Sequence, residues 1–185
     1  LKTLAFDIET NTQFGKEMGP EKDAIIMIAL YGDGFRKVIT WKRFDTNLNY
    51  LEFVESELEL IERFQQILDE YKPDVLTGYF SDGFDLPFLK ARAEKYKIKL
   101  SVGLDKSAIK VKKGKLPLAE ITGIAHIDTF KFVRRIFRTS FTSFKLDYVA
   151  QELLGEGKTK VDMEQLYNAW EQNNGLEKFC EYNLQ

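Results

Sequence analysis

The chain has 185 residues, of which 44% are hydrophobic, so it is long enough to bury the core of one compact domain. Its net charge of −2 argues against a protein that coats long stretches of duplex DNA. A single cysteine excludes an internal disulfide framework and fits a reducing, intracellular setting. No run of 18 apolar residues is present, which is the length that would predict a membrane-spanning helix.

Apolar residues recur with strand and helix spacing in turn along the first two thirds of the chain. The strands expected from apolar runs are 2–8, 24–32, 36–42, 74–78 and 124–127. Ser56 and Glu59 have the spacing of a capping box, which predicts a helix that ends at Pro73. A second helix is expected from Leu86 to about Lys97.

The last third of the chain is expected to be mainly helical. A basic β-hairpin centred on Gly114 comes first, and helical spacing then predominates over 129–185. Breaks are expected near 139–145, 155–160 and 173–175. Early strands, a crossover helix and a helical tail predict an α/β fold with a mixed sheet flanked by helices. We expect residues 1–185 to form a single domain, with Cys180 as a small buried apolar group on its last helix.

Two carboxylates lie on one side of the first expected strand. Side chains alternate across a strand, so Asp7 and Glu9 face the same way, about 7 Å apart, and Ile8 faces the opposite surface. Two such acids repel each other unless a cation lies between them, and Mg²⁺ prefers ligands of this kind. A strand end with two solvated acids is the common alternative.

A second acid, Asp85, follows the strand at 74–78 through a short loop and stands where a helix begins. A carboxylate in this place is by default a helix N-cap. The loop also leaves the end of a strand, where α/β sheets usually place their sites, so Asp85 could reach an ion held by Asp7 and Glu9. Phe84 beside it is either a face on which a nucleobase stacks or an ordinary core residue.

Basic side chains are concentrated in residues 101–150, which carry ten lysines and arginines and four acids. They lie in the hairpin region 106–115 and, further on, at Lys131, Arg134, Arg135, Arg138 and Lys145. A solvated hairpin and an edge that contacts phosphates both explain such a distribution, and charge alone does not separate them.

Several motifs together resemble a known family. They are Asp7–Thr10, Leu76–Leu89, Ile127-Asp128, Lys145–Gly155 and Tyr182–Gln185, in this order along nearly the whole chain. In order and spacing they resemble the 3′–5′ proofreading exonuclease domain of family B DNA polymerases of archaeal type.

The resemblance implies an RNase H-like fold of the DEDD exonuclease group, with the basic β-hairpin as an insertion. It implies that Asp7, Glu9 and Asp85 bind two divalent ions, Mg²⁺ or Mn²⁺, with Asp7 between them. Tyr182 would orient the attacking water, so Asp7, Glu9, Asp85 and Tyr182 are the expected catalytic residues. Thr10, Phe80 and Phe84 are the expected substrate contacts.

The sequence departs from the family pattern at two places. The third motif usually continues from its tyrosine through three residues to an aspartate, which would be residue 186, beyond Gln185. We therefore expect a fragment of a longer polymerase. No other acid replaces it by spacing, because Asp128 fits a strand end, Asp147 a helix start and Asp162 a helix cap. Phe80 stands where the family usually has an asparagine.

Two further features are interpreted as structural. His126 is the only histidine and lies in an apolar strand context, so we expect a structural role for it. The run Gly155-Glu156-Gly157-Lys158-Thr159 resembles the end of a phosphate-binding loop, but Glu152 stands where that motif requires glycine. It is better interpreted as a helix end followed by a loop.

The expected function is hydrolysis of the 3′-terminal phosphodiester of single-stranded DNA by a two-metal-ion mechanism, for proofreading. Without the fourth acid the chain is expected to be weakly active or inactive. One alternative is a degenerate exonuclease-like domain with a structural or strand-binding role, and another is a stand-alone ribonuclease. The expected partners are a single-stranded 3′ end and the polymerase domains of the parent chain. We expect a monomer without membrane contact, located in the cytoplasm at the nucleoid.

Overall fold

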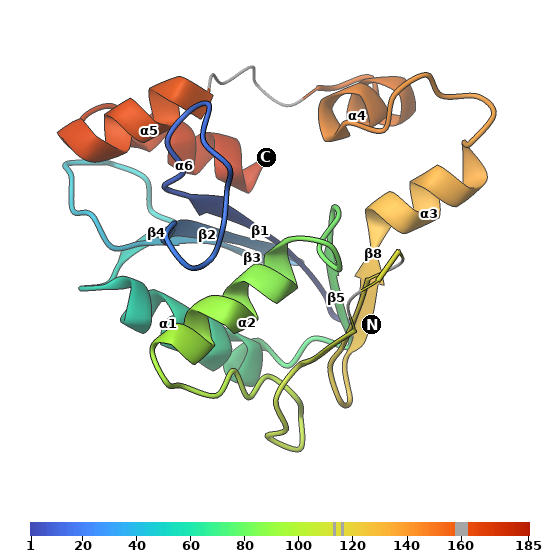
Figure 1. Cartoon of the computed structure of the whole chain (residues 1–185), viewed down its shortest axis with the longest axis horizontal. Coiled ribbons are helices and arrows are strands. Elements are labelled where there is room, and N and C mark those ends of the chain that lie inside the picture. Colours follow the sequence, from blue (N-terminus) through green and yellow to red (C-terminus); the bar gives the residue numbers. More distant parts are fainter. Residues whose placement is uncertain (113, 116, 158–162) are drawn as a thin grey trace.

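The computed structural model describes residues 1–112, 114–115, 117–157 and 163–185 (Figure 1). Its main element is a mixed sheet in the order β4-β3-β2-β1-β5-β8. The strands are β1 (Thr3–Thr10), β2 (Ile25–Gly32), β3 (Phe35–Thr40), β4 (Leu51–Phe53), β5 (Val75–Gly78) and β8 (Ala125–Asp128). β1 is antiparallel to β2 and parallel to β5, and β8 is parallel to β5. The expected mixed α/β sheet is confirmed.

A separate two-stranded sheet lies in the basic region. β6 (Lys110–Lys112) and β7 (Leu118–Glu120) pair antiparallel, with Lys110 opposite Glu120. They flank Gly114, where the sequence predicted a hairpin, while residues 113 and 116 lie outside the described part. That this element is an insertion relative to the family stays a prediction.

The described part of the chain contains six helices. They are α1 (Glu57–Tyr71), α2 (Asp85–Lys95), α3 (Thr129–Ile136), α4 (Leu146–Leu154), α5 (Met163–Gln172) and α6 (Glu177–Leu184). The breaks predicted at 139–145 and 173–175 separate α3 from α4 and α5 from α6. The break at 155–160 begins at Gly155, the cap of α4, and Lys158–Lys160 lie outside the described residues together with Asp162.

The two faces of the sheet are covered by different helices. Leu4, Phe6 and Ile8 of β1 pack in a core with the apolar side of α1 and with α2. On the other face, Met27 of β2 belongs to a second core with Trp170 of α5. Figure 1 shows α5 and α6 over β2 and β3, with α3 and α4 set apart from them beyond β1 and β5. Residues of α4 and of the end of α6 line one cavity.

The start of α1 follows the predicted capping pattern with one change. Ser56 is the N-cap, and its hydroxyl accepts a hydrogen bond from the Glu59 backbone N–H. The Glu59 carboxylate accepts the N–H of Glu55, one residue before the position expected in a capping box. Two backbone donors at the helix start are therefore satisfied.

Cys180 is fully buried on α6, as predicted. Burial raises the pKa of its thiol to about 12, so the nucleophilic thiolate is suppressed at neutral pH. The structural interpretation of this cysteine is confirmed.

None of the helices in the described part of the chain is both long enough and apolar enough to cross a lipid bilayer.

Candidate active site

β1 presents the first acidic pair at the carboxyl end of the strand. Ile8 is buried in the core beneath the sheet, so the alternation of the strand directs its neighbours to the opposite face. A register shift between Glu9 and Thr10 interrupts the pairing with β2 at this end. Both residues next to this shift are buried, with Glu9 7% exposed and Thr10 5% exposed.

Asp85 is brought to the same strand by the loop that follows β5. Its Oδ1 atom accepts a hydrogen bond from the backbone N–H of Ile8 at 3.2 Å. The side chain is 2% exposed, and Phe84 occupies the N-cap position of α2, so Asp85 is the first helical residue. The alternative of an N-cap aspartate is therefore wrong, and the carboxylate is aimed at β1.

The electrostatic environment of Asp85 favours its neutral form. Burial, followed by the negative charge of Asp7, raises the pKa of Asp85 from 3.8 to about 8. The charge of Asp128 acts in the same direction, while hydrogen bonds from the backbone N–H groups of Asp85 and Ile8 oppose the shift. A cation between the two carboxylates would remove this repulsion, which is why the pair fits a hard divalent ion.

Asp128 holds the loop that carries Asp85. Its carboxylate accepts the backbone N–H of Phe80 at 2.9 Å, of Asp82 at 3.2 Å and of Phe130 at 3.0 Å. It is the last residue of β8, as predicted, and also the N-cap of α3. Its role in positioning the loop was missed, because the sequence gives no sign that the strand end lies beside that loop.

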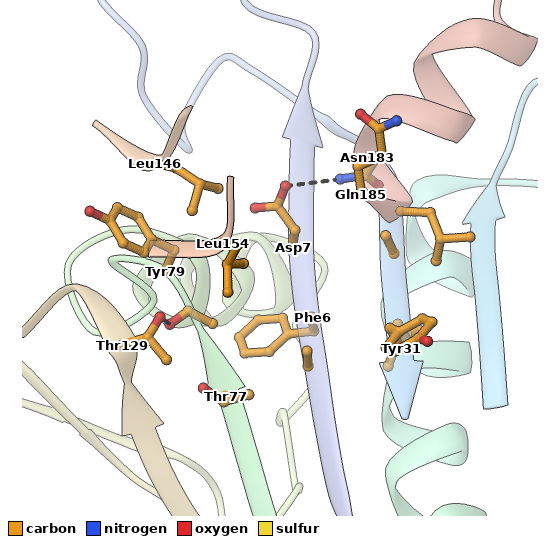
Figure 2. Close-up of a pocket in the computed structure, with 15 residues that line it drawn as sticks. Phe6, Asp7, Tyr31, Thr77, Tyr79, Thr129, Leu146, Leu154, Asn183 and Gln185 are labelled. Carbon is orange, nitrogen blue, oxygen red and sulfur yellow. Dashed lines mark hydrogen bonds between the residues drawn. The ribbon is translucent and has the colours of Figure 1, made fainter. Parts of the chain in front are cut away.

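α6 reaches the site from the other side. The Asn183 side chain donates from Nδ2 to Oδ2 of Asp7 at 3.2 Å, as the dashed line in Figure 2 shows. Asn183 is 3% exposed and was not predicted as a site residue, since an asparagine inside a helix carries no signal of its own. The preceding residue, Tyr182, is half-buried on the same helix.

A cavity of about 550 Å³ opens beside Asp7. Figure 2 shows Leu146 and Leu154 of α4 on one side of it and Asn183 and Gln185 on the other. Its lining is formed by Ala5, Phe6, Asp7, Ala29, Leu30, Tyr31, Thr77, Gly78, Tyr79, Thr129, Leu146, Leu154, Asn183, Leu184 and Gln185. Most of these side chains are apolar, and Asp7 is the acidic one among them.

The sequence of the chain matches the family described as DNA polymerase family B, exonuclease domain, over residues 1–149. The chain belongs to this family. Similar proteins include the DNA polymerases of Pyrococcus glycovorans, 41% identical over 186 residues, Pyrococcus horikoshii, 40% identical over 186 residues, and Thermococcus litoralis, 39% identical over 188 residues. Each match covers 100% of this chain but only 23%, 15% and 11% of the respective polymerase. The chain thus spans less than a quarter of the length of these relatives.

Of the residues that the family resemblance singled out, Asp7 and Asp85 lie close enough for the charge of Asp7 to raise the pKa of Asp85. In the described part of the chain, no three His, Cys, Asp or Glu side chains form a group that could hold a metal ion. Glu9 follows Asp7 on β1 but does not complete such a group, and Tyr182 is not among the residues that line the cavity. Carboxylate oxygens are the ligands that a hard cation prefers. The described side chains, however, do not surround a position for the ion.

The three predicted substrate contacts of the exonuclease domain differ in their surroundings. Thr10 shares a hydrogen bond with the Thr12 hydroxyl at 3.0 Å. Phe84 packs against the main core, with its ring centroid 5.4 Å from that of Phe88, which favours the core interpretation. Phe80 is 45% exposed and has a φ of 63°, a left-handed conformation that is rare for a bulky side chain.

His126 has the structural role that the sequence predicted. Its Nε2 lies 2.9 Å from the Ser81 hydroxyl, and its Nδ1 lies 3.2 Å from the carbonyl oxygen of Ala119 and 3.3 Å from Asp82. Asp82 also accepts the backbone N–H of Ala119 at 2.5 Å and pairs with Lys131. This buried network attaches β7 and α3 to the loop before α2.

Proposed function

We propose that the chain is the 3′–5′ exonuclease domain of a family B DNA polymerase and hydrolyses the terminal phosphodiester of a single-stranded DNA 3′ end. The observation that carries the proposal is the hydrogen bond from the Ile8 N–H to Asp85, beside a cavity whose wall contains Asp7. It joins the first acidic motif to the second at one end of β1. Membership in the exonuclease family supports the same reaction class.

Asp7, Glu9 and Asp85 would hold the divalent ions, Mg²⁺ or Mn²⁺. When bound, two such ions generate the attacking hydroxide and stabilise the leaving oxygen of an in-line displacement. The raised pKa of Asp85 supports this assignment, because a carboxyl group kept neutral by burial and by a neighbouring negative charge ionises readily once a cation is supplied.

The other residues of the site would act by positioning. Asn183 holds the Asp7 carboxylate from α6, and Asp128 fixes the loop before α2 through three backbone N–H groups. Tyr182 would orient the attacking water, and Thr10, Phe80 and Phe84 would contact the terminal nucleotides. Catalysis in such a site comes mainly from fixed geometry and electrostatic stabilisation.

The proposal includes a parent protein. The chain would be a single exonuclease domain with an RNase H-like sheet, and the remaining polymerase domains would supply most of the grip on DNA. The relatives support this, since each is several times longer than the chain. Such a polymerase would act in the cytoplasm at the nucleoid, and the isolated chain would be monomeric.

The test is digestion of a 5′-labelled single-stranded oligonucleotide in Mg²⁺ or Mn²⁺. Three proteins are compared: the chain as given, the chain extended by one aspartate after Gln185, and the extended chain with Asp7→Ala. We expect stepwise shortening from the 3′ end with the extended chain, little with the chain as given, and none with Asp7→Ala. Cleavage that survives Asp7→Ala would refute the proposed site.

A degenerate exonuclease-like domain is the second candidate. Two observations favour it: Phe80 offers a ring where the family usually has a hydrogen-bonding amide, and no group of three acids closes around an ion among the described residues. A lack of cleavage by the extended chain, together with retained binding of single-stranded DNA, would decide for it. A parallel digestion of RNA separates the stand-alone ribonuclease from both.

A further inference from the structure

The segment 129–145, which contains α3 and the connection to α4, combines two residue types to an unusual degree. It has five phenylalanines and five lysines or arginines, and no aspartate or glutamate. The phenylalanines are Phe130, Phe132, Phe137, Phe141 and Phe144. Aromatic rings interleaved with uncompensated positive charge are typical of surfaces that bind single-stranded nucleic acid.

Four of these rings and Phe80 form a continuous series of contacts, which we call the aromatic strip. Phe80 lies 5.1 Å from Phe130, and Phe130 lies 6.5 Å from Phe144, measured between ring centroids. The strip continues from Phe144 to Phe141 at 6.4 Å and from Phe141 to Phe137 at 4.6 Å, the last pair being parallel within 9°. The contacts thus connect Phe80, in the loop before α2, with Phe137 at the end of α3.

The near end of the aromatic strip adjoins the candidate active site. The Tyr79 ring lies 5.5 Å from Phe130, and its hydroxyl donates to the carbonyl oxygen of Phe144 at 2.6 Å. Tyr79 also lines the cavity beside Asp7, together with Thr129 and Leu146 (Figure 2). Tyr79 therefore connects the cavity that contains Asp7 with the near end of the aromatic strip.

Exposure and charge along the aromatic strip suit bases and phosphates. Phe80 is 45% exposed, and the other rings of the strip are half-buried, so each keeps part of its surface in solvent. The Arg134 guanidinium lies 5.9 Å from the centre of the Phe130 ring, and Arg135 and Arg138 are exposed on the same segment. A small core for α3 would account for the ring contacts, but it leaves the exposed Phe80 and the excess of arginine unexplained.

We propose that the aromatic strip stacks the bases of single-stranded DNA upstream of the 3′ end, while Arg134, Arg135 and Arg138 contact its phosphates. This inference rests on the proposed exonuclease function and extends it from the terminal nucleotide to the strand behind it. The ligand class is a single strand with intact bases, because a duplex hides the faces that would stack.

The first test varies the DNA and leaves the protein unchanged. Binding of labelled oligothymidylates of about 4 and about 12 nucleotides is measured by fluorescence anisotropy in EDTA, where no cleavage occurs. The longer strand is expected to bind more tightly. Replacing the bases behind the 3′-terminal pair by abasic residues is expected to weaken its binding about tenfold, because stacking is lost while every phosphate remains. Unchanged binding of the abasic strand would overturn the proposal.

The second test varies the protein with matched controls. Phe141→Leu keeps apolar volume and removes a ring of the strip, and is expected to weaken binding of the longer strand about tenfold. Phe132→Leu removes an exposed ring of the same segment outside the strip and is expected to change nothing. Arg138→Gln is expected to lower the slope of log affinity against log salt by about 0.7, and Arg36→Gln on β3 is expected to leave it unchanged.

These outcomes separate the strip from the exonuclease. Cleavage by the extended chain combined with binding that ignores abasic residues would refute the strip and leave the nuclease standing. Base-dependent binding without cleavage would support the strip and count against the nuclease. If Phe141→Leu alters the circular dichroism spectrum, the abasic comparison on the unaltered protein decides the matter alone.

Discussion

The backbone N–H of Ile8 donates a hydrogen bond to the carboxylate of Asp85 at 3.2 Å, across 77 positions of sequence. Ile8 separates the two acids of the first motif and is itself anchored in the core. This hydrogen bond fixes Asp85 to the strand that carries Asp7 and Glu9. A displacement of the loop before α2 breaks this bond and separates the acids, so the site depends on both the sheet and the loop.

The raised pKa of Asp85 predicts that the metal-free protein loses stability as the pH rises. The folded-state pKa of about 8 lies above the ordinary value of 3.8, so the contribution of this group is complete below about pH 4 and is lost between about pH 4 and pH 8. The loss is at most about 1.4 kcal/mol per pH unit. Thermal unfolding in EDTA across this range, compared with Asp85→Asn, measures it, because the amide cannot ionise.

Added Mg²⁺ should counteract that loss. A cation between Asp7 and Asp85 stabilises the ionised form, so the unfolding temperature is expected to rise more at pH 8 than at pH 5. Asp33→Asn, in the exposed turn between β2 and β3, is the control and should retain the full pH dependence of the unaltered chain. The same pH profile for the unaltered chain and Asp85→Asn would contradict the assignment.

Removal of the Asp128 carboxylate should destabilise the fold and disorganise the site. Asp128→Ala leaves three backbone N–H groups without their acceptor, in a place that is 5% exposed, and should cost about 2 to 4 kcal/mol. Urea unfolding measures the loss. Asp147→Ala, at an exposed position in the first turn of α4, removes a carboxylate without such bonds to this loop and should cost less than about 1 kcal/mol.

The ion pair of Glu57 and Arg92 should contribute far more than a surface pair. Both side chains are 3% exposed, and Glu57 also accepts the Ile25 N–H at 2.7 Å and the Tyr96 hydroxyl at 2.8 Å. Arg92→Met leaves a buried carboxylate without its cation and should lower the free energy of unfolding by about 3 to 5 kcal/mol. Equal effects of Arg92→Met and the control below would contradict this prediction.

The control for that variant is Lys90→Met on the same helix. Lys90 and Glu94 form an i,i+4 pair at 3.6 Å, with the Glu94 side chain 65% exposed. Loss of this pair should change the free energy of unfolding by less than about 0.5 kcal/mol, because water screens the charges and the long side chains lose rotamer freedom when paired.

Local patterns predicted most elements and missed those that depend on distant contacts. The capping box at Ser56 marked α1, and the apolar run at 24–32 marked the central strand. β4, a strand of three residues, escaped prediction because its half-buried side chains have no clear period and only its pairing with β3 defines it. Asn183 could not be predicted as a partner of Asp7, since nothing local in a helix identifies what it faces across the sheet.

The same limit applies to the carboxylates. Alternation along the strand predicted that Ile8 faces away from Asp7 and Glu9, and its burial in the core agrees with that, because side-chain alternation depends only on strand geometry. It gave no account of whether Glu9 and Asp85 close around an ion, which depends on the loop conformation and on the bound metal. The left-handed φ of Phe80 was equally beyond sequence reasoning, because nothing local shows that its backbone N–H bonds to Asp128, 48 positions further along the chain.

Phe80 offers a test that separates backbone strain from the ring. Phe80→Asn places a residue that tolerates the left-handed conformation at φ 63° and should gain about 1 kcal/mol. It also removes the ring 5.1 Å from Phe130, a pair worth about 0.5 to 1.5 kcal/mol, so the net change in unfolding free energy should be small. Lys97→Asn, at an exposed position with φ 59°, isolates the backbone gain.

Urea unfolding of both variants should therefore show Lys97→Asn more stable than the unaltered chain and Phe80→Asn close to it. If instead Phe80→Asn gains as much as Lys97→Asn, the ring contributes nothing to the fold. Unchanged binding of the longer oligothymidylate would then remove Phe80 from the aromatic strip as well.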